Sequence, residues 1–366
     1  MNSIWVKNKR LWVILSIYLM LCGALAIFLR NPPDAVIDYL IQSTVSWNQN
    51  RKFFEEDGLY VITTGTGAPM PDKNRAGSQT VVVAGEQVLV FDAGPGSTLK
   101  LELSPVDVGN LDALFITHFH SDHIGGMGEL MLKRWANGSP QQPLAIYGPP
   151  GVEEILQGFE TAYQMDKMHR IDHHGEEVMP STGFGGAAHP FDLGKDLMSS
   201  KVVYRKGDVE VIAFNVDHSP VFPAVGYRVQ YKNRSVVITG DTKYKESLIA
   251  HSKNADVLLS EALNKKFSTM LANAGQNTAT NITAIATDIQ DYHISPKEAA
   301  DVAREAGVQQ LVLTHILPPV PHELLVRPFL KEARQAFEGN IYMANDGTMI
   351  FLPLGSKKVN ITELLK

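Results

Sequence analysis

The chain has 366 residues, of which 33 are Lys or Arg and 39 are Asp or Glu, so its formal net charge at pH 7 is −6. This length can bury a large core, and this charge argues against a protein that coats nucleic acid with a broad basic surface. A single cysteine, Cys22, excludes an intramolecular disulfide.

The first predicted element is a transmembrane helix over residues 11–29, which are uncharged and mostly apolar. A helix of this length spans about 30 Å of hydrocarbon. The basic residues among residues 1–10 predict that this end stays in the cytoplasm, which places the rest of the chain on the periplasmic side of the inner (cell) membrane. The alternative is cleavage as a signal peptide near residues 24–26, with secretion to the periplasm.

Residues 58–356 are predicted to form the folded domain, between a linker at residues 30–57 and a C-terminal tail at residues 357–366. We expect a short helix in the linker around residues 35–39. Short runs of β-branched and aromatic residues predict strands within the domain. The clearest runs are residues 59–63, 80–83, 88–91, 209–216, 227–231, 235–239 and 310–314.

Helical segments lie between these predicted strands. Residues 296–307 are typical of a helix, with Ser295 as N-cap, Pro296 in the first turn and Gly307 at the end. Strands that alternate with helices indicate an α/β fold.

Residues 117–123, which read Thr-His-Phe-His-Ser-Asp-His, follow an apolar run and concentrate metal-ligating side chains. Alternate side chains of a strand share one face, so His118 and His120 can reach one metal ion. The chain then turns toward a helix, which lets Asp122 and His123 reach a second ion. Ligands of this kind suit zinc, so the motif predicts two adjacent metal ions.

Four more polar residues follow predicted strands, where α/β proteins keep functional side chains. They are Asp92, His218, Asp241 and His315. Together with residues 117–123 they resemble the five sequence blocks of the metallo-β-lactamase fold superfamily of dinuclear metallohydrolases, in the family's order across residues 58–352. The resemblance implies a four-layer αβ/βα sandwich, here preceded by the one transmembrane helix.

The same resemblance implies how the ligands divide between two zinc ions. One ion would be held by His118, His120 and His218, and the other by Asp122, His123 and His315, with Asp241 bridging them. Asp92 would support these ligands by hydrogen bonds. Iron or manganese would suit the same nitrogen and oxygen ligands.

Two further residues resemble a proton-donating pair. Residues 258–262 are similar to the segment in which ribonuclease Z enzymes carry His-Glu-Ala, although Ser260 stands in place of the histidine. Glu261 is retained, and His293 matches the second functional histidine of that group. A glutamate beside a histidine lets the imidazole give a proton to a leaving oxygen. Glu261 and His293 are therefore catalytic candidates, and Asp122 is a third because it, or Asp241, could orient the nucleophile.

The middle of the chain resembles the arylsulfatase-like subgroup. The expected activity is hydrolysis of small esters, with aryl sulfate leading and a water held between the metal ions as nucleophile. The expected partners are a small-molecule ester and the membrane, with Arg75 as a candidate substrate-binding residue. A homodimer is a further expectation, since similar proteins are commonly dimers.

Nucleic acid is not an expected partner, because acidic residues outnumber basic ones in the segment at residues 165–200, where a tRNA-gripping arm would be basic. The histidines of this segment are expected to lie outside the metal site. The alternatives are a ribonuclease Z-type endonuclease or phosphodiesterase that processes tRNA 3′ ends, a lactonase, and a non-catalytic membrane-tethered binding protein.

Overall fold

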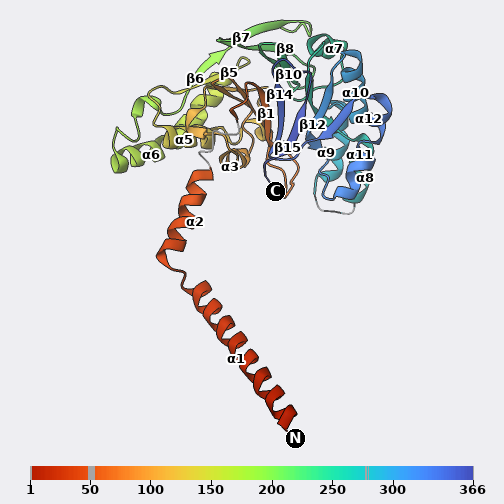
Figure 1. The fold of residues 1–366 in the computed structure, drawn as a ribbon. Helices are drawn as coiled ribbons and strands as arrows, with labels where there is room; N and C mark the ends of the chain where they lie inside the picture. The colour runs from red at the N-terminus through yellow and green to blue at the C-terminus, as the bar shows by residue number, and fades with distance from the viewer. Residues whose placement is uncertain (1, 48–53, 277, 279, 366) are drawn as a thin grey trace. The chain divides into compact units, whose positions relative to one another are not determined.

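A computed structural model describes residues 2–47, 54–276, 278 and 280–365. The chain divides into two compact units, residues 1–50 and residues 51–366. The colours of Figure 1 follow the chain from the N-terminal helices to the second unit, which contains the strands.

The N-terminal unit consists of two helices, α1 (Asn2–Arg30) and α2 (Asp34–Trp47). Within α1, Leu11–Arg30 is long and apolar enough to cross a membrane, and its side chains are exposed. A signal sequence would meet the same criterion of length and composition. The linker helix expected around residues 35–39 is longer than predicted, because residues 34–47 contain no proline or glycine to end it.

The second unit contains two sheets. The first sheet has the strand order β15-β14-β1-β2-β3-β4-β5-β6 and the second has the order β13-β12-β11-β10-β9-β8-β7. The strands of the first are β1 (Gly58–Gly65), β2 (Gln79–Ala84), β3 (Gln87–Phe91), β4 (Ala113–Phe115), β5 (Leu144–Gly148), β6 (Gly186–Pro190), β14 (Thr348–Pro353) and β15 (Asn360–Glu363). Those of the second are β7 (Ser200–Lys206), β8 (Val209–Asn215), β9 (Val225–Tyr231), β10 (Arg234–Ile238), β11 (Val257–Leu263), β12 (Gln310–Leu317) and β13 (Asn340–Met343).

Helices pack on the outer face of each sheet, which gives the four layers expected for this fold (Figure 1). Beside the first sheet are α3 (Ser97–Glu102), α4 (Ser121–Ile124), α5 (Met127–Gly138) and α6 (Val152–His174). Beside the second are α7 (Glu246–Ser252), α8 (Lys265–Gly275), α9 (Ile282–Asp288), α10 (Pro296–Glu305), α11 (Val326–Phe329) and α12 (Lys331–Ala336). Short 3-10 turns connect them at residues 108–110, 181–183, 289–291 and 323–325.

The alternation of side chains along the strands explains why both faces of each sheet are buried. In β1, Leu59 and Val61 join the core between the sheets, whereas Tyr60 and Ile62 join the core beneath the helices of the first sheet. Successive side chains of a strand point to opposite faces, so an uninterrupted apolar run fills two cores at once.

Two boundaries differ from the sequence prediction. The expected tail at residues 357–366 contains β15, which pairs antiparallel with β14 and extends the first sheet. Strand β12 runs on through His315 to Leu317, whereas the predicted strand ends at Thr314. Both differences arise because pairing with a neighbouring strand decides where a strand ends, more than the intrinsic preference of its residues.

Helix α10 offers a test of this local structure. The Ser295 hydroxyl accepts a hydrogen bond from the Glu298 backbone N–H, and the Glu298 carboxylate accepts one from the Ser295 N–H. We predict that Ser295→Ala lowers the free energy of unfolding by about 1 kcal/mol, since it removes the N-cap acceptor. Denaturant titration would measure the change, with Ser200→Ala, at the exposed start of β7, as control. An equal effect of both substitutions would contradict the assigned role.

Candidate metal centre

The candidate metal ligands come together where strands of both sheets end. The first sheet supplies the loop after β4 and the short helix α4, which carry His118, His120, Asp122 and His123. The second sheet supplies the loop after β8, the loop after β10, and β12, which carry His218, Asp241 and His315. Residues up to 197 positions apart in the chain, from His118 to His315, therefore meet at one junction.

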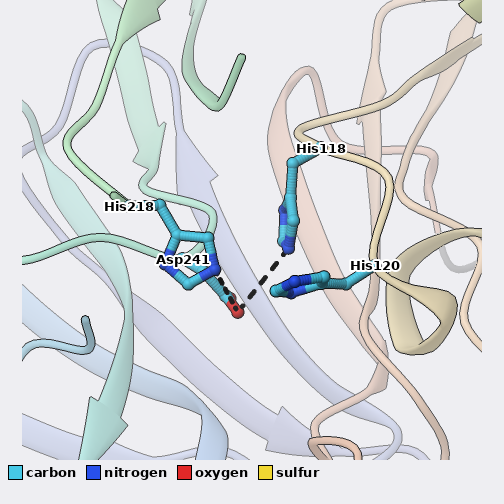
Figure 2. Close-up of side chains that lie close together, drawn as sticks. All are labelled: His118, His120, His218 and Asp241. Carbon is cyan, nitrogen blue, oxygen red and sulfur yellow. Dashed lines mark ion pairs between the residues drawn. The ribbon is translucent and has the colours of Figure 1, made fainter. Parts of the chain in front are cut away.

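One group consists of three imidazoles and a carboxylate. Ligand atoms of His118, His120, His218 and Asp241 all lie within 4.8 Å of one another. The Asp241 Oδ2 atom is 3.8 Å from Nε2 of His118 and 3.8 Å from Nε2 of His218. Figure 2 shows these four side chains pointing toward a common centre, with the two separations drawn as dashed lines.

A second group adjoins the first through the same carboxylate. Ligand atoms of Asp122, His123 and His315 lie within 4.8 Å of one another, and Nε2 of His315 is 3.1 Å from Oδ2 of Asp122. Asp241 places Oδ1 3.3 Å from Nε2 of His123 and Oδ2 3.5 Å from Nε2 of His315. Asp241 thus stands between the two groups, which is the position expected of a bridging ligand.

Hydrogen bonds behind the ligands fix which imidazole nitrogen faces the centre. Oδ2 of Asp92 is 2.8 Å from Nδ1 of His123, and Oδ1 accepts the Thr117 backbone N–H. Nδ1 of His218 lies 2.9 Å from the Tyr292 carbonyl oxygen. When Nδ1 donates, Nε2 presents its lone pair to a metal. Asp92 therefore supports the site from behind, while Thr117 and Tyr292, which we did not single out in the sequence, complete the support.

The buried polar atoms of the centre fit metal ions. Among the described residues no hydrogen bond of suitable geometry reaches four of these atoms, namely His118 Nε2, His123 Nε2, His218 Nε2 and Asp241 Oδ1. Burying such atoms without partners is costly. Divalent metal ions would satisfy them, and the nitrogen and oxygen donors suit zinc, iron or manganese.

The protonation of the ligands depends on burial and on their neighbours. Burial lowers the pKa of His118 well below its ordinary value and that of His218 to about 4, so both are neutral and ready to bind a cation. Burial also opposes the charged form of His315, but the carboxylates of Asp241 and Asp122 raise its pKa to about 9. Metal binding must displace the proton from such a group, which makes metal affinity depend on pH.

Glu261 and His293 form a buried pair next to Asp241. The two Glu261 oxygens are 2.9 and 2.8 Å from Nδ1 of His293, and one of them also accepts the Thr242 backbone N–H. Burial raises the pKa of Glu261, and the charge of a protonated His293 opposes that rise. Nδ1 of His293 is 3.8 Å from Oδ2 of Asp241. The pair can therefore hold a proton donor beside the metal ligands.

Two residues singled out in the sequence have structural partners. The Arg75 guanidinium donates to the Thr66 hydroxyl, the Ala344 carbonyl and the Asn345 side chain, so it ties two loops together and is not brought among the metal ligands. Ser260 is buried and its hydroxyl donates to the Glu261 carbonyl. The sequence could not show that Arg75 contacts Ala344 and Asn345, because these two residues are distant from it in the chain.

The histidines at residues 165–200 lie outside the described groups of candidate metal ligands. His169, His173 and His174 are on α6, and His189 is on β6, where its ring stacks on Tyr147 with centroids 4.7 Å apart. The segment itself is ordered into α6, a short turn and β6, which pairs parallel with β5.

Comparisons with known proteins give consistent results. Residues 87–316 match the family model described as beta-lactamase superfamily domain. A ribonuclease Z of Mycobacterium sp. (strain KMS) is 35% identical over 263 residues, which cover 72% of this chain and 85% of the relative. A ribonuclease Z of Mycobacterium bovis (strain BCG / Pasteur 1173P2) is 32% identical over 291 residues, which cover 79% of this chain and 96% of the relative.

Solved structures share the fold. Human tRNase Z, short form, has a TM-score of 0.58 at 24% identity, covering 81% of this chain and 100% of the other. The metallo-beta-lactamase fold protein YhfI from Bacillus subtilis has a TM-score of 0.57 at 23% identity, with the same coverage.

A pair of histidine substitutions tests the ligand assignment. We predict that His120→Ala lowers the bound metal per chain and abolishes turnover, because it removes one of three imidazoles from the first group. His189→Ala should leave both properties unchanged, since His189 stacks on Tyr147 outside the centre. Metal content measured by plasma mass spectrometry, with turnover of bis-4-nitrophenyl phosphate, would check this. Normal metal content in His120→Ala would refute the assignment.

Proposed function

Since the chain belongs to the beta-lactamase superfamily and is a metal-dependent hydrolase, we propose a specific reaction for it. The protein hydrolyses phosphodiester bonds of RNA in the manner of a ribonuclease Z. Two relatives with that name are more than 30% identical over most of their length. Within the site, the Glu261–His293 pair beside Asp241 is the observation that carries the proposal.

The comparisons correct the expectation about partners. A small-molecule ester as substrate, with nucleic acid excluded, is wrong, because the relatives are ribonucleases. The ester was expected because the middle of the chain resembles the arylsulfatase-like subgroup, and nucleic acid was not expected because of the net charge of −6 and the acidic segment at residues 165–200. Net charge sums over the whole surface, whereas an enzyme that cuts RNA needs positive charge only where the strand lies.

The metal ions that the two ligand groups would hold supply Lewis acidity, which polarises the phosphate and makes water a nucleophile at neutral pH. The protein residues do the remaining work. Asp241 and Asp122 hold the two ligand groups at fixed separation and can orient the attacking water by accepting its hydrogen. His293 gives a proton from its ring to the departing ribose oxygen, while Glu261 orients it through Nδ1.

This proton donor matters because of the leaving group in RNA. The ribose oxygen would depart as an alkoxide, which is a strong base, so it needs a proton as it leaves. A nitrophenolate is a weak base and departs readily without one. A buried acid–imidazole pair beside the reacting centre is therefore most useful for an alkyl phosphodiester such as RNA.

The proposal predicts metal-dependent RNA cleavage by the full chain. We would load the detergent-solubilised protein with zinc and offer it a precursor tRNA with a 3′ extension, an unstructured RNA and 4-nitrophenyl sulfate. RNA should be cut, cleavage should stop with chelator, and His120→Ala should be inactive. Turnover of the sulfate without RNA cleavage would contradict the proposal.

The role of His293 predicts a dependence on the leaving group. His293→Ala should slow RNA cleavage by about 100-fold, the loss of a typical general acid. Turnover of bis-4-nitrophenyl phosphate should fall much less. Glu261→Gln should show the same selectivity more weakly, because the amide still contacts Nδ1. An equal fall in the turnover of both substrates, or a loss of bound metal, would contradict the assignment of His293 as the proton donor.

We also propose that α1 anchors the protein in the membrane. The exposed apolar side chains of Leu11–Arg30 and the basic residues before them support this. The charge asymmetry favours an enzyme unit on the periplasmic side. On that side the substrate would be RNA outside the cytoplasm, and on the other side it would be precursor tRNA.

Fusion proteins test this location. Alkaline phosphatase fused after the C-terminus should be active, because that enzyme folds only outside the cytoplasm, and a green fluorescent protein fusion should be dim. Deletion of residues 2–30 should reverse both results. An uncleaved anchor keeps the unfused chain at 40.3 kDa in the membrane fraction. A shorter, soluble product would instead indicate a cleaved signal peptide.

A further inference from the structure

An apolar groove lies on the helices that follow the strands carrying Glu261 and His315. Its volume is about 760 Å³, and it is lined by Met70, Phe267, Met270, Leu271, Pro318 and Pro328, among others. Pro318 directly follows the end of β12, and α8 begins two residues after the end of β11. Residues just after the ends of both strands therefore line the groove.

A second, basic cavity of about 660 Å³ adjoins this groove. The two share Lys266, Phe267 and Pro328 in their walls, so they lie side by side, and we call the pair the channel. The second cavity also contains Arg327 and Lys331, and its charged lining consists of three basic residues and one acidic residue, Glu332. One end of the channel is thus apolar, and the other end is positively charged.

Phe267 lies where the two parts of the channel meet. Its ring packs edge to face against Phe329, with centroids 5.8 Å apart, and remains partly exposed. The Asn264 side chain accepts the Phe267 backbone N–H and donates to the Phe329 carbonyl, which holds both aromatic residues in place. The channel therefore presents a fixed aromatic surface between an apolar wall and basic side chains.

We propose that this channel binds a single-stranded segment of the RNA substrate next to the bond that is cut. Bases would stack on Phe267 and contact the apolar wall, while phosphates would lie near Lys266, Arg327 and Lys331. Aromatic side chains interleaved with basic ones are how proteins bind single strands without reading sequence. The inference rests on the proposed RNA substrate and adds a place for the strand beyond the reacting phosphate.

The arrangement of charge favours a polyanion over other occupants. A segment of another protein or a lipid chain could fill the apolar part, but neither explains three exposed cations gathered at one end from α8, α11 and α12. A nucleic acid strand has an apolar face in each base and a negative charge on each linkage, so it matches both parts of the channel.

Binding of a fluorescent 12-nucleotide uridine RNA to the zinc-loaded full chain carrying His293→Ala, which should cut RNA about 100-fold more slowly, tests this with little cleavage. The double variant Arg327→Glu/Lys331→Glu should weaken binding about tenfold or more at 50 mM salt. The slope of log K against log salt concentration should also become less negative by about 1.4, since two phosphate contacts are lost and each contact on a single strand contributes roughly 0.7 to the slope. Phe267→Ala should weaken binding about tenfold with the salt slope unchanged, because stacking carries no charge.

Lys201→Glu is the matched control, because Lys201 is exposed on β7, at the opposite edge of the second sheet. The affinity of Lys201→Glu for the RNA, and the salt dependence of that affinity, should equal those of the unchanged chain. The zinc-loaded channel variants should keep their turnover of bis-4-nitrophenyl phosphate, which is too small to reach the channel, while their KM for RNA rises. This retained turnover also shows that the variants are folded.

Several outcomes would overturn the channel assignment. They are RNA binding unchanged in the channel variants, an equal loss in Lys201→Glu, or binding of phospholipid vesicles through these residues in place of RNA. If the unchanged chain binds RNA through the channel but does not cut it, the proposed function fails while the channel stands. If the unchanged chain cuts RNA but the channel variants bind RNA normally, the proposed function stands and the channel assignment fails.

Discussion

The buried cluster of histidines and aspartates at the junction of the two sheets is the constraint on which the rest of the structure depends. It places several polar atoms in an interior that is otherwise apolar, and no hydrogen bond from the described residues reaches these atoms. Such atoms must be held in place by many neighbours to persist. Two residues there, Asp92 and His315, have positive φ angles of 59° and 44°, a conformation that non-glycine residues seldom adopt. The strands on either side hold this strained backbone.

The residues that the sequence singled out as metal ligands lie together in the structure, whereas parts of their surroundings differ from the prediction. His118, His120, Asp122 and His123 stand together in the chain, because a metal needs several ligands and one loop can supply most of them. The apolar runs before them identified buried strands, since such runs fill two cores. By contrast, β15 is short and lies at a sheet edge, and only its pairing with β14 defines it as a strand.

Contacts between distant segments explain the remaining differences. Arg75 was a candidate substrate-binding residue, and in the structure it is held by Ala344 and Asn345, which no local pattern connects to it. The substrate class was misjudged for a similar reason. A net charge of −6 conceals the fact that Lys266, Arg327 and Lys331 come from separate helices to line one cavity. Folding, and not composition, decides where charge gathers.

The candidate ligands are divided between the two sheets, and this division would make the stability of the protein in the cell depend on metal. The segment at residues 118–123 follows a strand of one sheet, whereas His218, Asp241 and His315 follow or lie in strands of the other. Metal ions bound there would act as cross-links between two halves of the domain, and their binding energy would add to the stability of the folded state. When metal is scarce, the junction would loosen and proteases would gain access. The amount of intact enzyme would then follow the supply of metal, a form of control that needs no separate regulator.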